Sequence, residues 1–244
     1  LLFGRLGWAP LNAVLIISGA FGVFRKDAVV AAGGYRTDTV GEDMELVVRL
    51  HHHYRLAGLP YRITYVPDPV CWTEVPEDLR TLKNQRIRWQ RGLCESLWWH
   101  WKLCCHPNSG TVGWLAFPFM VVFEWFGPAF EVLGYGLLLA GFVLGLVSWQ
   151  VWLVTTSVAV GLGIVLSLSA ILMEEMTFHV YQRPSDFWRL LAVAVLENFG
   201  YRQLNAYWKL VGLVRWLRGT KAEWGNMIRS ASWQSKVGSP VGGR

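Results

Sequence analysis

Hydrophobic and polar positions follow two different patterns, which divide the sequence into a polar front half and an apolar back half. In the front half, short apolar groups predict strands at Ala13–Ser18 and Tyr61–Val66 and a further extended piece at Val70–Thr73. Apolar residues at helical spacing predict a helix from Glu42 to Gly58 and another within Glu77–Trp101. We therefore expect both strands and helices over residues 1–105.

The back half contains two stretches without a charged side chain. One lies between Lys102 and Glu124, and the other covers residues 132–173, which are the 42 positions between Glu131 and Glu174. The longer stretch accommodates two membrane passes of about 20 residues each. We expect a membrane region at 106–218, with helices near 112–130, 131–148, 151–173 and 187–217. The last carries Glu197, Arg202 and Lys209, so a helix lying along the membrane interface is the alternative there.

The charge distribution predicts which side of a membrane each part would face. The net charge is +6, and the sequence from Lys209 onward has seven basic residues against one acidic residue, Glu223. The loop Glu174–Asp186 carries a net charge of −2. By the positive-inside rule, the basic tail at 219–244 and the front half are cytoplasmic, in a multi-pass protein of the inner or plasma membrane. Nucleic acid is not an expected partner, because the front half has no concentrated basic face with interleaved aromatic residues.

Cysteine and histidine spacings argue against a disulfide framework or a metal site. The four cysteines have no C-x-x-C spacing, and we expect reduced thiols. The run His51–His53 would splay in three directions on a helix, which favours a solvated face over a metal site. The sequence begins Leu-Leu-Phe without an initiator methionine or a signal-peptide pattern, and we expect it to be cut from a longer protein.

Two groups of side chains are of types suited to chemistry. On a helix, Gln85, Arg88 and Trp89 share one face, where the guanidinium suits phosphate oxygens and the indole offers a platform for a sugar ring. The alternative is a surface helix with a solvated Gln and Arg and a buried Trp. Carboxylates at Glu42 and Asp43 in a first turn are stabilised by the helix dipole, and the same position suits a general base.

Three blocks occur in a fixed order along the sequence. They are Ser18-Gly19-Ala20-Phe21-Gly22-Val23-Phe24-Arg25 followed by Gly33-Gly34-Tyr35, then Gly41-Glu42-Asp43-Met44-Glu45-Leu46, and last Gln85-x-x-Arg88-Trp89. With apolar helices behind them, these blocks resemble the C-terminal part of a processive family 2 glycosyltransferase, such as the cellulose, hyaluronan and poly-N-acetylglucosamine synthases. The resemblance implies an α/β fold for 1–105, the C-terminal half of a Rossmann-like GT-A domain with an interfacial helix, followed by an α-helical transmembrane region.

The resemblance also implies a role for each matching residue. Asp43 corresponds to the general base that removes a proton from the acceptor hydroxyl, and Gln85 and Arg88 correspond to groups that contact the donor diphosphate. Trp89 corresponds to the platform under the acceptor sugar. The other residues expected on the acceptor side are Ser18, Gly19, Ala20 and Glu42.

One family feature is missing from this sequence. Family members carry a D-x-D in an N-terminal half, and its carboxylates hold Mg²⁺ or Mn²⁺ on the donor diphosphate. No D-x-D in a strand context occurs here, and Asp68 and Asp186 lack that setting. We therefore expect no metal ligands in this chain, and little or no turnover by this chain alone.

The expected activity is that of a hexosyltransferase that adds a sugar from a nucleotide-sugar donor, by resemblance a UDP-sugar, to a growing polysaccharide. Two alternatives stay open. One is transfer of a single sugar to a lipid acceptor. The other is a membrane transport or binding subunit, in which Glu124 and Glu131 line a path rather than lie at the headgroup level. The lipid bilayer is an expected partner, and an accessory subunit that completes a channel is a further partner to test.

Overall fold

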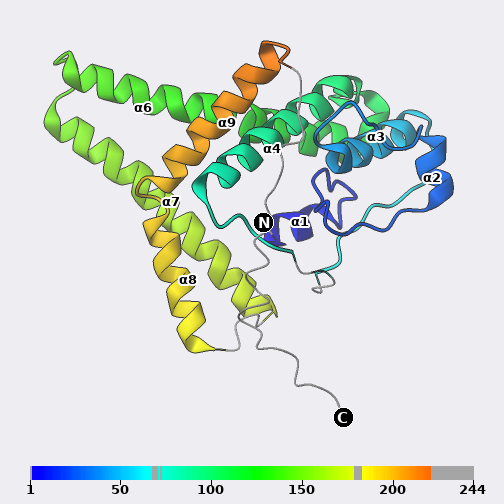
Figure 1. Ribbon diagram of the computed structural model, residues 1–244, viewed down its shortest axis with the longest axis horizontal. Coiled ribbons are helices and arrows are strands. Elements are labelled where there is room, and N and C mark those ends of the chain that lie inside the picture. The colour runs from blue at the N-terminus through cyan, green and yellow to red at the C-terminus, as the bar shows by residue number, and fades with distance from the viewer. Residues whose placement is uncertain (1, 68–70, 72, 179–182, 221–244) are drawn as a thin grey trace.

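The computed structural model describes residues 2–67, 71, 73–178 and 183–220, which form helices joined by loops (Figure 1). Two 3-10 turns follow α4, and two π-helical turns flank the short helix α5. The elements are α1 (Leu2–Trp8), α2 (Lys26–Ala31), α3 (Glu42–Leu56), α4 (Leu79–Trp99), η1 (Trp101–Leu103), η2 (Pro107–Ser109), η3 (Val112–Ala116), α5 (Phe117–Phe119), η4 (Met120–Trp125), α6 (Gly127–Val143), α7 (Trp149–Phe178), α8 (Pro184–Leu196) and α9 (Tyr201–Leu217).

The predicted α/β fold is wrong, since none of the described residues forms a strand. The segments at 13–18 and 61–66 are extended, but a strand also needs a backbone ladder to a neighbour. Side chains bind these segments instead. The Asn12 amide donates to the Tyr61 carbonyl at 3.0 Å, and its oxygen accepts from the Ile63 N–H at 2.7 Å. The predicted extended piece at 70–73 lies mostly outside the described residues.

The two predicted front-half helices are confirmed as α3 and α4. Three acids stand in the first turn of α3, where the helix dipole favours negative charge, and Gly58 follows the helix with φ 66°. At the start of α4, the Asp78 carboxylate accepts a hydrogen bond from the Thr81 N–H at 2.8 Å. This side-chain cap satisfies a backbone donor that the first turn would leave unpaired.

Helix α4 is the centre of the packing, because α3 lies along one side of it and α9 along another (Figure 1). The start of α3 approaches α4 closely. A Cβ atom at Gly92 would lie 2.9 Å from the Gly41 Cα atom. Behind this crossing, Val48 of α3, Leu97 of α4 and Phe117 of α5 are fully buried in one hydrophobic core.

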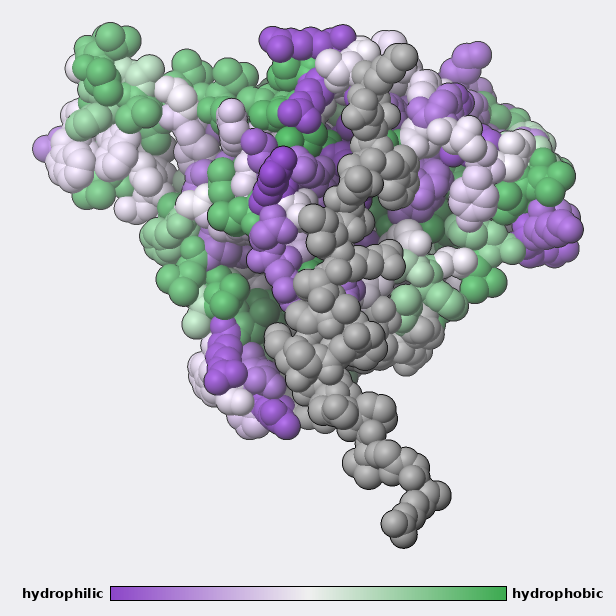
Figure 2. Space-filling view, in the orientation of Figure 1, coloured by the Kyte–Doolittle hydropathy of each residue, from purple (hydrophilic) through white to green (hydrophobic). Residues whose placement is uncertain are grey.

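Two helical runs have the length and composition of membrane spans, Val112–Val143 and Trp149–Phe178. The α6 part of the first run and α7 form a hairpin that projects away from α2 and α3 (Figure 1). The most apolar window of each run is largely unburied, whereas residues 112–125 at the start of the first run contribute to the hydrophobic core, and Figure 2 shows hydrophobic residues over much of the hairpin end of the molecule. Contiguous apolar surface of this kind marks a site of contact with protein or membrane.

The back-half helices differ in extent from the ranges that the sequence suggested. Residues 112–143 form one run that includes η3, α5, η4 and α6. The range 187–217 holds most of α8 and all of α9, and these two helices are separated at Gly200, where φ is 108°. Of the expected basic tail at 219–244, residues 221–244 lie outside the described residues.

Candidate active site

The Asp43 carboxylate stands at the start of α3 beside the loop of small residues. Its Oδ1 atom accepts a hydrogen bond from the Met44 N–H at 2.8 Å. A Cβ atom at Gly19 would lie 2.7 Å from Asp43 Oδ2, so any larger side chain would displace the carboxylate. Ser18, Gly19 and Ala20 are exposed, and Glu42 is half-buried. The loop at 18–20 and the Asp43 carboxylate are therefore in direct contact.

The second group of predicted residues lies in the first half of α4. Gln85 and Arg88 are half-buried, and Trp89 is 52% exposed. The guanidinium of Arg86 lies over the Trp89 ring, 4.7 Å from its centroid. The alternative interpretation, a surface helix with a buried Trp, does not hold, because the Trp89 indole is partly exposed.

The crossing of Gly41 and Gly92 brings the two groups toward each other. Arg88 and Trp89 precede Gly92 by three or four residues, or about 5–6 Å along the helix axis. Asp43 follows Gly41 by two residues, at most about 7.6 Å. With the 2.9 Å approach at the crossing, the backbones of Asp43 and Arg88 lie within roughly 18 Å. This bound limits the separation of the two backbones but does not by itself bring the carboxylate, guanidinium and indole into contact, and their roles in one site stay predictions.

A buried carboxylate that the sequence did not single out joins these elements. Glu95 of α4 is 5% exposed. Its Oε2 atom accepts a hydrogen bond from the Thr39 hydroxyl at 2.7 Å, and its Oε1 atom accepts from Arg91 Nε at 2.7 Å. The Thr39 hydroxyl also accepts from the Gly41 N–H at 3.2 Å. The loop that leads into Asp43 is therefore tied to α4 one turn beyond Gly92.

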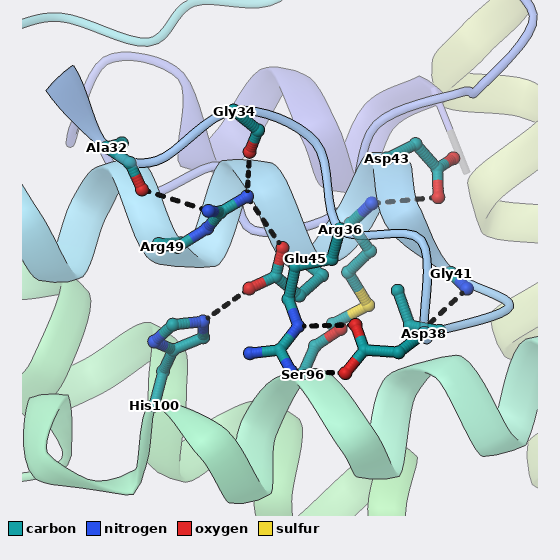
Figure 3. A network of polar contacts seen from close by, with 12 residues as sticks. Ala32, Gly34, Arg36, Asp38, Gly41, Asp43, Glu45, Arg49, Ser96 and His100 are labelled. Carbon is teal, nitrogen blue, oxygen red and sulfur yellow. Dashed lines mark hydrogen bonds and ion pairs between the residues drawn. The ribbon is translucent and has the colours of Figure 1, made fainter. Parts of the chain in front are cut away.

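A second buried carboxylate, Glu45, holds the other side of the same interface (Figure 3). Arg49 pairs with Glu45 at 3.0 Å, and His100 Nε2 of the α4 end lies 2.9 Å from the other carboxylate oxygen. Arg49 also donates to the carbonyl oxygens of Ala32 and Gly34, which fixes the turn after α2 on α3. The i, i+4 spacing of Glu45 and Arg49 is visible in the sequence, but such pairs are usually solvated.

The expectation of a solvated histidine face is wrong for His51, which is fully buried. Its Nε2 lies 2.9 Å from the Val14 carbonyl oxygen, and its Nδ1 lies 2.5 Å from the Tyr61 hydroxyl. Because a carbonyl only accepts, Nε2 donates and Nδ1 accepts, which is the neutral tautomer. Burial lowers the pKa of His51 to about 4. Burial, with His100 as a secondary cause, also lowers the pKa of His52, so these histidines serve packing.

Both acids in the first apolar run have cationic partners on α9. Lys209 Nζ lies 3.2 Å from Glu124, and Arg202 Nε lies 3.3 Å from Glu131. The two acids are seven residues apart, as are the two bases, so α9 and the apolar run pair in one antiparallel register. Such pairs reduce the cost of charge in an apolar region, and they give these acids a structural role.

The described residues contain no group of three or more His, Cys, Asp or Glu side chains that could hold a metal ion. The described residues therefore offer no ligand set for the Mg²⁺ or Mn²⁺ that the resemblance implies. We derive no step through a metal. The Cys94 thiol is also unsuited to chemistry, because burial raises its pKa to about 12.

Comparison with known proteins defines the class to which this fold and site belong. The sequence model described as "Glycosyl transferase family group 2" matches residues 5–168, and the chain belongs to this family. The predicted resemblance is thereby confirmed. No solved structure matches the chain.

Two curated relatives share the name poly-beta-1,6-N-acetyl-D-glucosamine synthase. The relative from Staphylococcus aureus (strain COL) is 46% identical over 81 residues, and the one from Staphylococcus epidermidis is 38% identical over 81 residues. In both cases the match covers 33% of this chain and 18% of the relative. The chain thus matches less than a fifth of the length of these relatives.

Proposed function

We propose that the chain is part of a membrane-bound inverting glycosyltransferase that transfers a sugar from a nucleotide-sugar donor to a growing polysaccharide. The observation that carries this proposal is the contact between Gly19 and the Asp43 carboxylate, beside the crossing of Gly41 and Gly92 on α4. Family membership supports the reaction class. The crossing supports a single site only in that it holds the start of α3 against α4, the helix that carries Gln85, Arg88 and Trp89.

Asp43 acts as the general base. Its carboxylate takes the proton from an acceptor hydroxyl, and the acceptor oxygen forms a bond to the anomeric carbon of the donor sugar. The bond from that carbon to the diphosphate oxygen breaks, and the nucleoside diphosphate leaves with the electron pair. The Met44 N–H and the close loop at Gly19 fix the orientation of the carboxylate before substrate arrives.

Arg88 and Gln85 hold the departing diphosphate, and Trp89 carries the acceptor sugar. A guanidinium gives two parallel donors to phosphate oxygens, and it stabilises the negative charge that gathers as the bond breaks. The exposed face of Trp89 suits stacking against a sugar ring, with Arg86 packed on the indole. Ser18, Gly19 and Ala20 form the wall beside the acceptor hydroxyl.

We further propose N-acetylglucosamine as the sugar and UDP as its carrier. The support is the printed name of the staphylococcal relatives, which share 46% and 38% of the matched residues. The two apolar runs cross the membrane with the site on the cytoplasmic face. Their exposed apolar surface supports this placement, and the two ion pairs between the first run and α9 count against a conducting path through Glu124 and Glu131.

The test is synthesis in membrane vesicles that carry the full-length enzyme of which the chain is proposed to be part, with radiolabelled UDP-N-acetylglucosamine and, as matched donors, UDP-glucose and UDP-glucuronate. The proposal predicts label in a ladder of oligomers from the first donor. Label in a single lipid-linked species would show transfer of one sugar to a lipid. Absence of label from all donors, in vesicles that contain folded protein, would refute the proposed activity.

A further inference from the structure

The run Val112–Val143 has a local defect where η4 meets α6. Pro128 has no N–H, so the Glu124 carbonyl loses the donor that an α-helix would supply. The N–H of Phe126 bonds to the Val121 carbonyl at 3.0 Å, and the N–H of Ala129 bonds to the Phe126 carbonyl at 2.9 Å. The N–H groups of Phe126 and Ala129 therefore do not bond to the Glu124 and Trp125 carbonyls. These two carbonyls need donors from another part of the molecule.

Gln90 of α4 supplies these partners. Its Nε2 atom donates to the Glu124 carbonyl at 3.0 Å and to the Trp125 carbonyl at 3.2 Å, so both hydrogens of the carboxamide are in use. Gln90 is 2% exposed. Buried carbonyl groups without a partner are costly, so position 90 requires a side chain that donates hydrogen bonds to both of them.

The opposite helix holds Gln90 in place. A Cβ atom at Gly212 of α9 would lie 3.0 Å from the Gln90 Cβ atom and 2.7 Å from the Ile87 carbonyl oxygen. Helix α4 is therefore wedged between α9 and the defect in the apolar run. The residue before Gln90 is Trp89, the proposed acceptor platform, so the fixed point lies next to the acceptor.

We infer that Gln90 is a positioning residue that fixes α4, and with it Trp89, at a set place relative to the proline defect in the apolar run. This inference rests on the proposed function. Its consequence is that the growing chain leaves Trp89 toward the apolar run in one geometry. Without the two hydrogen bonds, α4 moves relative to the apolar run. The positions of Gln85 and Arg88 relative to each other do not change, because both belong to α4. Acceptor retention then suffers, and donor binding does not.

The first measurement does not depend on activity. The Gln90→Met variant keeps the size of the side chain and removes both donors, and Pro128→Ala restores an N–H that can bond to the Glu124 carbonyl. We expect Gln90→Met to lower the melting temperature in detergent by several degrees, and we expect the same change to cost at most half as much in the Pro128→Ala background. An equal loss in both backgrounds would overturn the inference, whether or not the protein is a glycosyltransferase.

The second measurement is the product ladder in vesicles. Gln90→Met should shorten the mean product by at least roughly fivefold, the factor that corresponds to one of the two hydrogen bonds that it removes, with the KM for the donor unchanged. Gln150→Glu on the exposed start of α7 is the control and should keep the parent ladder. Parent-like products from Gln90→Met, or a rise in donor KM that accounts for the loss, would overturn the positioning role. If the parent makes no oligomer in these vesicles, the proposed function is refuted instead. The inference is then decided by the melting temperatures of Gln90→Met in the parent and in the Pro128→Ala background.

Discussion

Replacing Gly92 by alanine tests the close α3–α4 crossing. The substitution should destabilise the protein at this crossing, whereas it would stabilise an ordinary helix. In a helix interior, alanine is usually more stable than glycine by about 1 kcal/mol. At position 92 the added Cβ atom would lie 2.9 Å from the Gly41 Cα atom, 3.1 Å from the Gly41 nitrogen and 3.6 Å from the Val40 carbonyl carbon. All three are backbone atoms, so the clash is relieved only if α3 moves.

The size of that effect follows from these distances. Restoring a normal contact of at least 3.4 Å requires a shift of the α3 start by roughly half an ångström, and overpacking of this kind costs about 1–3 kcal/mol. Gly136 in α6 is the matched control, since nothing lies within 4 Å of its added Cβ atom. We expect Gly92→Ala to be less stable than Gly136→Ala by about 1–3 kcal/mol.

The assay is thermal unfolding in detergent, followed by the rate of sugar transfer. Because the shift moves Asp43 relative to Arg88 and Trp89, and a misplacement of about 1 Å can cost roughly a hundredfold in rate, transfer should fall far more than stability. Gly136→Ala should keep the parent rate. The described crossing is contradicted if the melting temperature of Gly92→Ala equals or exceeds that of Gly136→Ala and if Gly92→Ala transfers sugar at the parent rate.

Two further predictions concern buried polar groups outside the apolar runs. Thr39→Val removes the hydroxyl bonded to Glu95 and should cost about 1.5–3 kcal/mol in the free energy of unfolding, whereas Thr39→Ser keeps the bond and should cost much less; equal losses would contradict the pairing. For His51, the pKa is lower in the folded state, about 4 against 6.5, so the unfolded state binds the proton first as the pH falls. Stability is therefore full above pH 6.5 and should fall by about 3 kcal/mol toward pH 4, measured as melting temperature against pH. His51→Gln should flatten this dependence, and a profile unchanged by that substitution would contradict the neutral, buried imidazole.

The helices of the front half could be predicted because their signals are local. Acids in a first turn, the Asp78 cap and Gly58 after the last turn of α3 act within a few residues of themselves. Long uncharged stretches likewise predict apolar helical runs, whatever surrounds them.

That the described residues form no strand could not be predicted in the same way. Residues 61–66 alternate between less and more exposed positions, the pattern of a strand. That alternation is the same whether the backbone pairs with another strand or, as here, with the side chain of Asn12. What decides between the two is a partner far away in the sequence, and a local pattern does not contain it.

The candidate site shows the same division. The types and spacing of Asp43, Arg88 and Trp89 predict their chemistry, but not the glycine contact that brings their helices together. Glu95 and Gln90 were missed because both have residue types that are usually solvated. Their burial depends on Thr39 and on the proline defect, which lie 56 and about 35 residues away along the chain.

The central claim is that the Asp43 carboxylate and the α4 side chains form one site, in which Asp43 takes the acceptor proton. The most direct measurement is donor binding and sugar transfer by Asp43→Asn in the same vesicles, with Asp27→Asn as the control, because Asp27 is exposed and paired with Arg25. The account predicts that Asp43→Asn binds the donor as the parent does and transfers no sugar, while Asp27→Asn does both. Sugar transfer by Asp43→Asn at the parent rate would contradict it.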